Sequence, residues 1–169
     1  WRYPVNLNLA AARPIQVNSG EAELPCTIRS TVGAGALTKT GAGVLTLTGT
    51  NTYTGTTLNH GAGGVIRANH GIGLPAVSYL QLNNGTWESS SNISRSLGVV
   101  AGQVSLANAS GFGAYASDIV VSLSTGAALT WAVGNFAPTT FILNSPYSDH
   151  NITFQNSVAL NAAVRTIQV

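Results

Sequence analysis

The sequence lacks most of the residues that catalytic and metal sites use. It has 169 residues but no methionine, one cysteine and only five acidic side chains. The lone Cys26 cannot form an internal disulfide, and no CxxC or Cys/His spacing accompanies it to build a zinc site. We therefore predict that Cys26 is a small buried apolar residue and that the chain uses no metal and no cofactor.

Charge is equally scarce. Charged residues make up 7% of the chain, and its net charge is +2. The cations are scattered singly rather than gathered into a patch, so the sequence predicts no nucleic-acid partner. No stretch approaches the ~18 apolar residues that span a bilayer, and no membrane span is expected. The chain begins at Trp1 without a charged and apolar leader, which we interpret as a segment of a longer protein.

What the sequence does contain is a short-range alternation of apolar and polar residues. Alternation with period two is typical of strands that bury one face, and it recurs along the whole chain. The alternating pairs include Ile15 with Val17, Leu45 with Leu47, Leu80 with Leu82, Val104 with Leu106, and Phe141 with Leu143. Clusters of Gly, Asn, Ser and Asp separate these runs and predict turns.

Many short strands at close, even spacing are compatible with a sandwich, a closed barrel or a β-solenoid. A sandwich would normally expose more Lys and Glu on its outer faces. Abundant Thr, Ser and Asn with a slim aliphatic core favour a solenoid, in which like residues stack from coil to coil. At ~20 to ~25 residues per coil, we expect an all-β parallel β-helix of about seven coils.

The two ends of the chain echo each other. Arg13-Pro14-Ile15-Gln16-Val17 is repeated, with one substitution, as Arg165-Thr166-Ile167-Gln168-Val169. We interpret residues 18–169 as one unit of an array and residues 1–17 as the junction with, or end of, the preceding unit. The fold should then be uncapped and stack end to end, with further copies of the chain as partners. The junction residues are Arg13, Ile15, Val17, Arg165, Ile167 and Val169.

One segment carries a specific resemblance. The run from Leu37 to Thr57 reads LTKTGAGVLTLTGTNTYTGTT. Its signature residues are Leu37, Lys39, Gly41, Gly43, Leu45, Leu47, Gly49, Asn51, Tyr53 and Gly55. The run resembles the autotransporter-associated β-strand repeat, also called the passenger-associated transport repeat. The resemblance implies a right-handed parallel β-helix of an exported bacterial surface protein, with the signature in residues 33–68 and a second half in residues 78–169.

The signature also makes physical sense. Leu45 and Leu47 should point inward while Thr46 points outward. Tyr53 is expected to keep its hydroxyl in water. After Gly55 the chain departs from the family pattern, and we interpret residues 56–64 as an enlarged loop.

Candidates for catalysis are few. Glu21 and Glu23 share a strand face, but a glycosidase needs two carboxylates across a groove, so we interpret them as solvated edge charges that discourage strand addition. The adjacent pair Asp149 and His150 has no nucleophile elbow and is assigned to a turn. His60 and His70 lack a third ligand for a metal. We predict no enzymatic activity, and a β-helical polysaccharide-degrading enzyme is the third alternative.

Aromatic side chains support one further alternative, an adhesin or glycan-binding module. Trp87, Tyr115 and Trp131 could offer flat apolar platforms to sugar rings. Trp131 alternates with Leu129 and Val133 and is assigned to the core. Trp87 lies among polar residues and is expected to be exposed, so Trp87 and Tyr115 are the candidate glycan contacts. The leading hypothesis is a non-enzymatic structural module of a secreted or cell-surface fibre.

Overall fold

The computed structural model describes residues 7–8 and 10–169. Part of the expected junction segment, residues 1–6 and 9, therefore lies outside the described residues. The strands are β1 (Leu7–Asn8), β2 (Arg13–Gln16), β3 (Glu21–Leu24), β4 (Ile28–Arg29), β5 (Leu37–Thr40), β6 (Val44–Leu47), β7 (Thr57–Ala68), β8 (Leu80–Ser89), β9 (Ile93–Arg95), β10 (Val104–Ala114), β11 (Ile119–Leu123), β12 (Leu129–Thr130), β13 (Phe136–Leu143), β14 (Ile152–Phe154), β15 (Val158–Ala159) and β16 (Thr166–Gln168). A single 3₁₀ turn, Ser124–Gly126, accompanies them.

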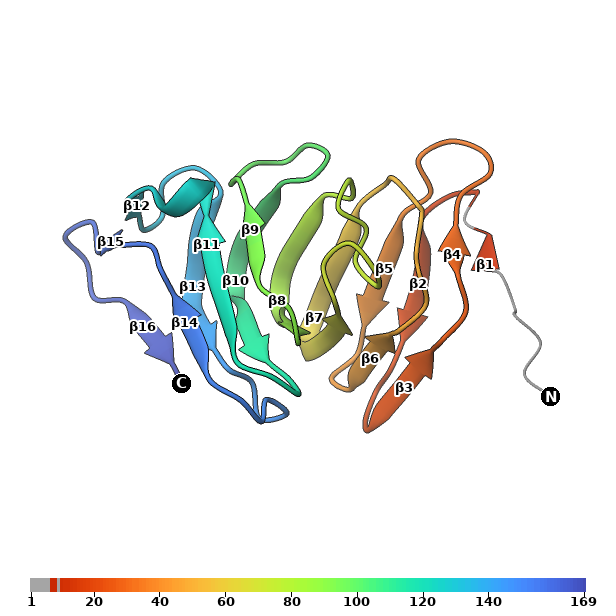
Figure 1. Ribbon diagram of the computed structural model, residues 1–169. Coiled ribbons are helices and arrows are strands. Elements are labelled where there is room, and N and C mark those ends of the chain that lie inside the picture. The colour runs from red at the N-terminus through yellow and green to blue at the C-terminus, as the bar shows by residue number, and fades with distance from the viewer. Residues whose placement is uncertain (1–6, 9) are drawn as a thin grey trace.

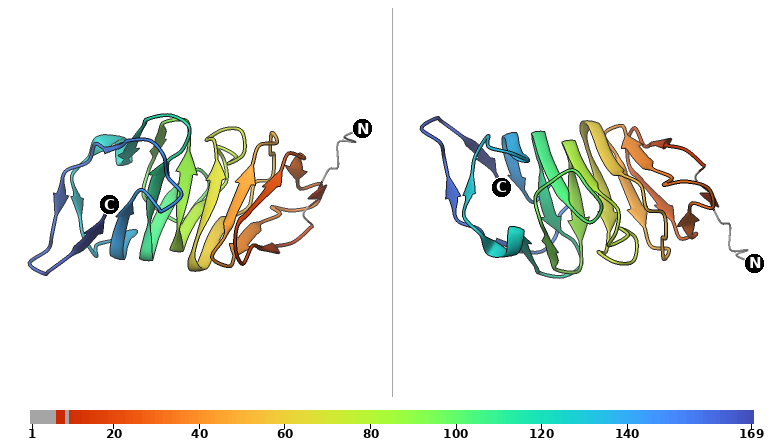
Figure 2. Two further views of the ribbon diagram at one scale, coloured as in Figure 1. Left: turned by 90° about the horizontal axis from the view of Figure 1, so that it is seen from below. Right: turned by 90° about the horizontal axis from the view of Figure 1, so that it is seen from above.

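The strands stack as a parallel β-solenoid (Figures 1 and 2). The largest sheet follows the order β16-β13-β10-β8-β7-β5-β2, and β3 and β6 extend its second half. Each strand along this order pairs in parallel with its neighbour one turn away. The prediction of a parallel coil is confirmed, and a sandwich of antiparallel sheets is excluded.

The coil has about six turns rather than the seven expected. The difference comes from the length of the last turns. Hydrogen bonds between consecutive turns show this lengthening. The bond between Thr57 and Ser78 joins residues 21 positions apart in the sequence, whereas the bond between Leu123 and Asn156 joins residues 33 positions apart. The longer turns hold the 3₁₀ turn and the added strands β12 and β15.

Each middle turn runs along one long bent strand. In β7 and β8 the register shifts between His60 and Gly64, where the residues between them face a single residue, Asn84, on β8. The segment that we interpreted as an enlarged loop is therefore a bulge inside a continuous strand. A bulge bends the strand, and this bend divides the large sheet into a first half and a second half.

The interior is continuous along the axis, and its side chains change from mainly aliphatic in the early turns to more aromatic in the late turns. Leu37, Leu45 and Leu47 fill the early turns and are buried. Aromatic rings fill the late turns, where Phe141 makes edge contacts with Phe112, Phe136 and Phe154. None of the helices among the described residues is long and apolar enough to cross a bilayer.

In the middle strands β6, β7, β8 and β10, the second half of the large sheet is buried on both faces. Residues of β6 and β7 that alternate with the core, including Val44, Thr46 and Val65, are also buried. The outward orientation of Thr46 thus does not bring it into water, because other side chains cover the outer face here. These covering groups define the candidate site.

Candidate functional site

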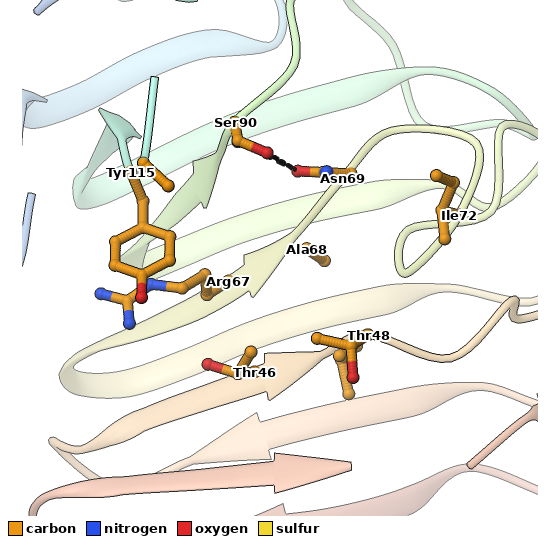
Figure 3. A pocket seen from close by; sticks show the side chains of 10 residues that line it. Thr46, Thr48, Arg67, Ala68, Asn69, Ile72, Ser90 and Tyr115 are labelled. Carbon is orange, nitrogen blue, oxygen red and sulfur yellow. Dashed lines mark hydrogen bonds between the residues drawn. The ribbon is translucent and has the colours of Figure 1, made fainter. Parts of the chain in front are cut away.

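The outer face of β6, β7 and β8 holds a cluster of charged residues in a chain that has few. Strand pairing places Thr46, Arg67 and Glu88 side by side on consecutive turns. Arg67 lies at the centre, with Tyr115 stacked on it and Thr46 beside it (Figure 3). We call Arg67, Glu21, Glu88, Ser145 and Ser148 the outer clamp.

Arg67 is held from several directions. Its Nε and Nη2 donate to Glu88 Oε2 at 3.1 and 2.9 Å. Its Nη1 donates to both carboxylate oxygens of Glu21 at 3.2 Å, and Nη2 also donates to the Tyr147 carbonyl. The guanidinium carbon lies 3.5 Å from the centre of the Tyr115 ring, a cation–π distance. A planar guanidinium with five donors suits such a crowded position better than a lysine would.

Glu88 is the most enclosed charge in the cluster. Its residue exposure is 0%, and Arg67 occupies one of its carboxylate oxygens. The other oxygen accepts hydrogen bonds from Ser145 and from Ser148, the latter at 2.8 Å. A buried carboxylate is tolerated only with such a complete set of partners. The outer clamp therefore fastens the loop between β13 and β14 onto turns whose residues lie about 60 positions earlier in the chain.

The arrangement does not form an acid–base pair. A glycosidase leaves its two carboxylates free to face a sugar across open space. Here Arg67 lies between Glu21 and Glu88 and bonds both. Glu23, the other half of the candidate dyad, accepts a hydrogen bond from Thr48 at 2.8 Å. Both β3 acids thus accept hydrogen bonds from threonines of the next turn, Thr46 in β6 and Thr48 directly after it, and they are not merely solvated edge charges.

A pocket of about 260 Å³ adjoins the outer clamp (Figure 3). Its polar rim is formed by Thr46, Thr48, Asn69, Ser90 and Tyr115. Asn69 Oδ1 accepts hydrogen bonds from the backbone and hydroxyl of Ser90, each at 3.0 Å, which fixes that side of the pocket. The lining combines these polar groups with Arg67 as its charged member and with the aliphatic residues Leu47, Ala68, Ile72 and Ala116.

The prediction that Trp87 is exposed is wrong. Trp87 is 0% exposed, because strand pairing places it between Ile66 and Phe112 on the inward row. Its polar neighbours Thr86 and Glu88 misled the sequence interpretation, since they are buried on the outer face instead of lying in water. Trp131 is in the core as predicted, and Tyr115 is half-buried against Arg67.

The signature residue Tyr53 departs from expectation, and Lys39, for which no position was predicted, is buried as well. Tyr53 is fully buried and its hydroxyl bonds Thr57 Oγ1 at 2.6 Å, so burial raises its pKa to about 12. Lys39 follows Leu37 on the inward face and is also fully buried. Its Nζ donates to the Gly41 carbonyl, and burial lowers its pKa to about 8. The alternation with Leu37 was the sequence signal for an inward lysine.

The remaining signature residues hold neighbouring turns together. Asn51 Oδ1 accepts from the Ile28 backbone at 2.7 Å, and its Nδ2 donates to the Gly73 carbonyl at 2.7 Å, so one side chain bridges three turns. A side chain at Gly49 would collide with the Cys26 carbonyl, and one at Gly55 with the Ala34 carbonyl. These two glycines are required by close approach of the preceding turn. Leu37, Leu45 and Leu47 are in the core, and the backbone of Gly41 and Gly43 touches that of residues 17–20.

The other candidates stay apart. Asp149 bonds His150 and the Ala116 backbone on an exposed loop, and the first of these bonds holds the pKa of the Asp149 carboxyl below its ordinary value. His60 contacts Asn83, whereas His70 lies on another side of the turn. Cys26 is half-buried against the core. Within residues 7–8 and 10–169, no three potential ligands gather into a metal site.

The two junction segments lie at opposite ends of the large sheet. They also pair with different halves of its strands. Ile15 pairs with Lys39 in the first half of the turn, and this row continues to Phe136. Ile167 pairs instead with Phe141, five residues further along β13. The sequence echo therefore does not mark equivalent positions in the coil.

Residues 37–62 match the family model described as passenger-associated-transport-repeat. This segment is thus similar to a passenger-associated transport repeat. The match covers β5, β6 and the first half of β7 up to the bulge, and it includes every signature residue. The chain matches no curated protein and no solved structure at a significant level. The family match and the parallel coil thus both fit a structural repeat.

Proposed function

We propose that the chain is a non-enzymatic structural module of an exported bacterial surface protein. The observation that carries this proposal is the passenger-associated transport repeat built into a continuous parallel coil. Strand pairing and core stacking accumulate with each turn of such a coil, which suits a long and stiff stalk. The charged groups on the outer face support the same role, since the outer clamp joins turns and offers no free acid or base.

The module stacks end to end with further coil. At the first turn the inward residues Ile15, Ala22 and Leu24 are only partly buried. At the last turn Phe154 is partly buried, and Ile167 and Val169 are 52% and 92% exposed. Each end thus presents half of an apolar stack and the open edge of a parallel strand, which another turn would cover.

Small-angle scattering at rising concentration, with electron imaging of the same samples, tests this role. Axial stacking lengthens the particle in steps of roughly 30 Å, from ~4.8 Å per turn over six turns. Ile167→Lys should abolish the lengthening, because it places a charge on the apolar end. The matched change Ile72→Lys, on an exposed isoleucine away from the ends, should leave it intact. Particles of constant length at all concentrations would contradict axial stacking.

A second candidate function is glycan contact at Tyr115. The pocket beside it offers amide and hydroxyl groups and an aromatic ring next to aliphatic side chains, and such a mixture of hydrogen-bonding and apolar groups suits a sugar. Asn69→Ala should then weaken binding on a glycan array, whereas Asn92→Ala, an exposed amide on another side of the coil, should not. Absence of any bound glycan for the unmodified chain would remove this candidate.

A further inference from the structure

Exposed aliphatic side chains gather along one edge of the coil. This edge is where each turn returns to the start of the next strand of the large sheet, immediately before β5, β8, β10, β13 and β16. These corners lie along the upper edge of Figure 1. Seven side chains there are at least half exposed, and we call them the valine edge: Val32, Val77, Val99, Val100, Val133, Leu160 and Val164.

The coil geometry aligns these corners. The residue that ends each corner accepts a hydrogen bond from a strand of the preceding turn, as when Leu80 donates to the Gln103 carbonyl and Leu106 to the Asn135 carbonyl. Gly102 also donates to the Val77 carbonyl at 3.1 Å, which brings the corners of β8 and β10 into direct contact. The valine edge is therefore a row parallel to the axis, although its members are scattered through the sequence.

The central corners are rigid. Arg95 is buried and donates to the carbonyl oxygens of Pro75 and Ser78 at 2.8 and 2.5 Å. It also reaches the Gln103 carbonyl at 3.4 Å. Within the next corner, the Val100 backbone donates to the Gln103 side chain at 3.1 Å. Val77, Val99 and Val100 are thus held in place before any partner arrives, which reduces the entropy cost of association.

The valine edge carries no charge except at its last corner, where Arg165 follows Val164 and its Nε donates to the Leu160 carbonyl at 3.0 Å. The corners at residues 30–36, 54–56, 75–79, 96–103, 131–135 and 158–164 contain no Lys, Arg, Asp or Glu. A run of exposed apolar residues of this kind marks an interaction site more often than a solvated surface. From Val32 to Val133 the corners have no charge of either sign, so this length of the edge offers no steering to an acidic or basic partner and does not repel an identical edge.

We propose that the valine edge joins two copies of this chain side by side. Apart from the corner at residues 54–56, which has no apolar side chain, each turn adds at least one member to the row, so a partner meets it along its length only if it has the same rise. A second coil of the same chain satisfies this condition, and its own uncharged edge is complementary to the first. The contact is small for one module and grows with each turn or module added, which makes it a device for bundling stalks laterally.

Sedimentation equilibrium and small-angle scattering test the proposal. The chain should form dimers as its concentration rises, with an enlarged cross-section. Val99→Glu combined with Val100→Glu should weaken dimerisation by about tenfold or more, because carboxylates would then face each other across the contact. High salt should not weaken association of the unmodified chain, since no ion pair holds it. The matched control Ile72→Glu removes an exposed aliphatic side chain away from the edge and should leave dimerisation unchanged.

Several outcomes would overturn the proposal. One is a particle cross-section that stays constant at every concentration. Another is that Ile72→Glu weakens dimerisation as much as the double variant Val99→Glu, Val100→Glu does. Lengthening without thickening would overturn lateral pairing while supporting the axial stacking proposed above. Binding to phosphatidylcholine vesicles without self-association would assign the valine edge to a lipid surface instead. Circular dichroism verifies that each variant is folded, and Val133→Glu provides a second disruptive change should the double variant not fold.

Discussion

The early and late turns of this coil have the same strand ladder but different interiors. In the early turns the inward row includes Lys39, Asn59 and Thr57, all fully buried. Asn59 Nδ2 donates to the carbonyls of Gly64 and Thr86 at 2.8 and 2.9 Å. In the late turns aromatic rings share the interior with aliphatic side chains such as Val121 and Leu123, and Trp131, Phe136 and Phe141 are in mutual edge contact.

Turn length also differs between the two regions. Residues paired between turns lie 23 positions apart in the sequence at Thr57 and Leu80 but 33 apart at Ile119 and Ile152. A short turn encloses a narrow interior, in which a single polar side chain reaches the backbone carbonyls on the opposite wall. The longer late turns hold the cluster of Trp and Phe rings, although a large ring also occurs in a short turn, where Trp87 pairs with Ile66, 21 positions earlier. Parallel strand pairing is therefore common to the early and late turns, whereas the length of the turns and the side chains in their interior differ.

The largest expected effect is the loss of a ring from the late turns. Phe141→Ala should lower the free energy of unfolding by about 4 kcal/mol, because the wide interior cannot collapse around the cavity. Denaturant unfolding followed by near-ultraviolet dichroism measures it. The control Val99→Ala removes a side chain that is 61% exposed and should change stability by less than ~0.5 kcal/mol. Equal losses in the two variants would contradict a packed aromatic interior.

The outer clamp connects the two regions, so breaking it tests whether they unfold together. Glu88→Ala should cost about 3 kcal/mol, because Arg67 would be left partly buried without its main partner. We also expect a broader unfolding transition as the early and late turns lose their link. Glu23→Ala, which removes an exposed carboxylate of the same face, is the comparison and should cost less than ~0.5 kcal/mol. A cooperative, unchanged transition in Glu88→Ala would refute the linking role.

Each region has one asparagine that bridges turns, and this pair sharpens the comparison. Asn51 bonds the Ile28 and Gly73 backbone, and Asn156 bonds the backbone of Leu123 and Ala127. Asn51→Ala and Asn156→Ala should each cost about 2 kcal/mol, from backbone groups left unpaired in the interior. Hydrogen exchange should show the loss of protection confined to the mutated region. Loss spread evenly along the coil would contradict the distinction.

The smallest expected effect is the pH dependence of the early turns. Burial lowers the pKa of Lys39 to about 8 from its ordinary value of 10.5. Above pH 8 the unfolded chain therefore holds a proton that the folded chain has released, and stability rises with pH. Because the pKa of Tyr53 is raised from 10.0, its opposite contribution begins only above pH 10. Denaturant unfolding should show that the free energy of unfolding rises by on the order of 1 kcal/mol between pH 8 and pH 10. This rise should be absent in Lys39→Met.

The sequence by itself determined the repeating parts of this protein. Alternation such as Leu45 and Leu47, with glycines where turns approach, is a local pattern, and the parallel coil follows from it because every turn obeys the same rule. The passenger-associated transport repeat was identifiable for the same reason. The absence of catalytic spacing around Glu21 and Glu23 was also readable, and it remains a prediction that the chain is not an enzyme.

Tertiary structure decided everything that depends on which face is covered. Alternation says that Trp87 and Glu88 point to opposite sides of a strand, but only the folded chain shows that both sides are buried there. Arg67 meets Glu21 from 46 positions away and the Tyr147 carbonyl from 80. The valine edge likewise exists only because successive turns stack in register. No local pattern encodes such distant contacts, because they depend on how many residues each turn uses before it returns.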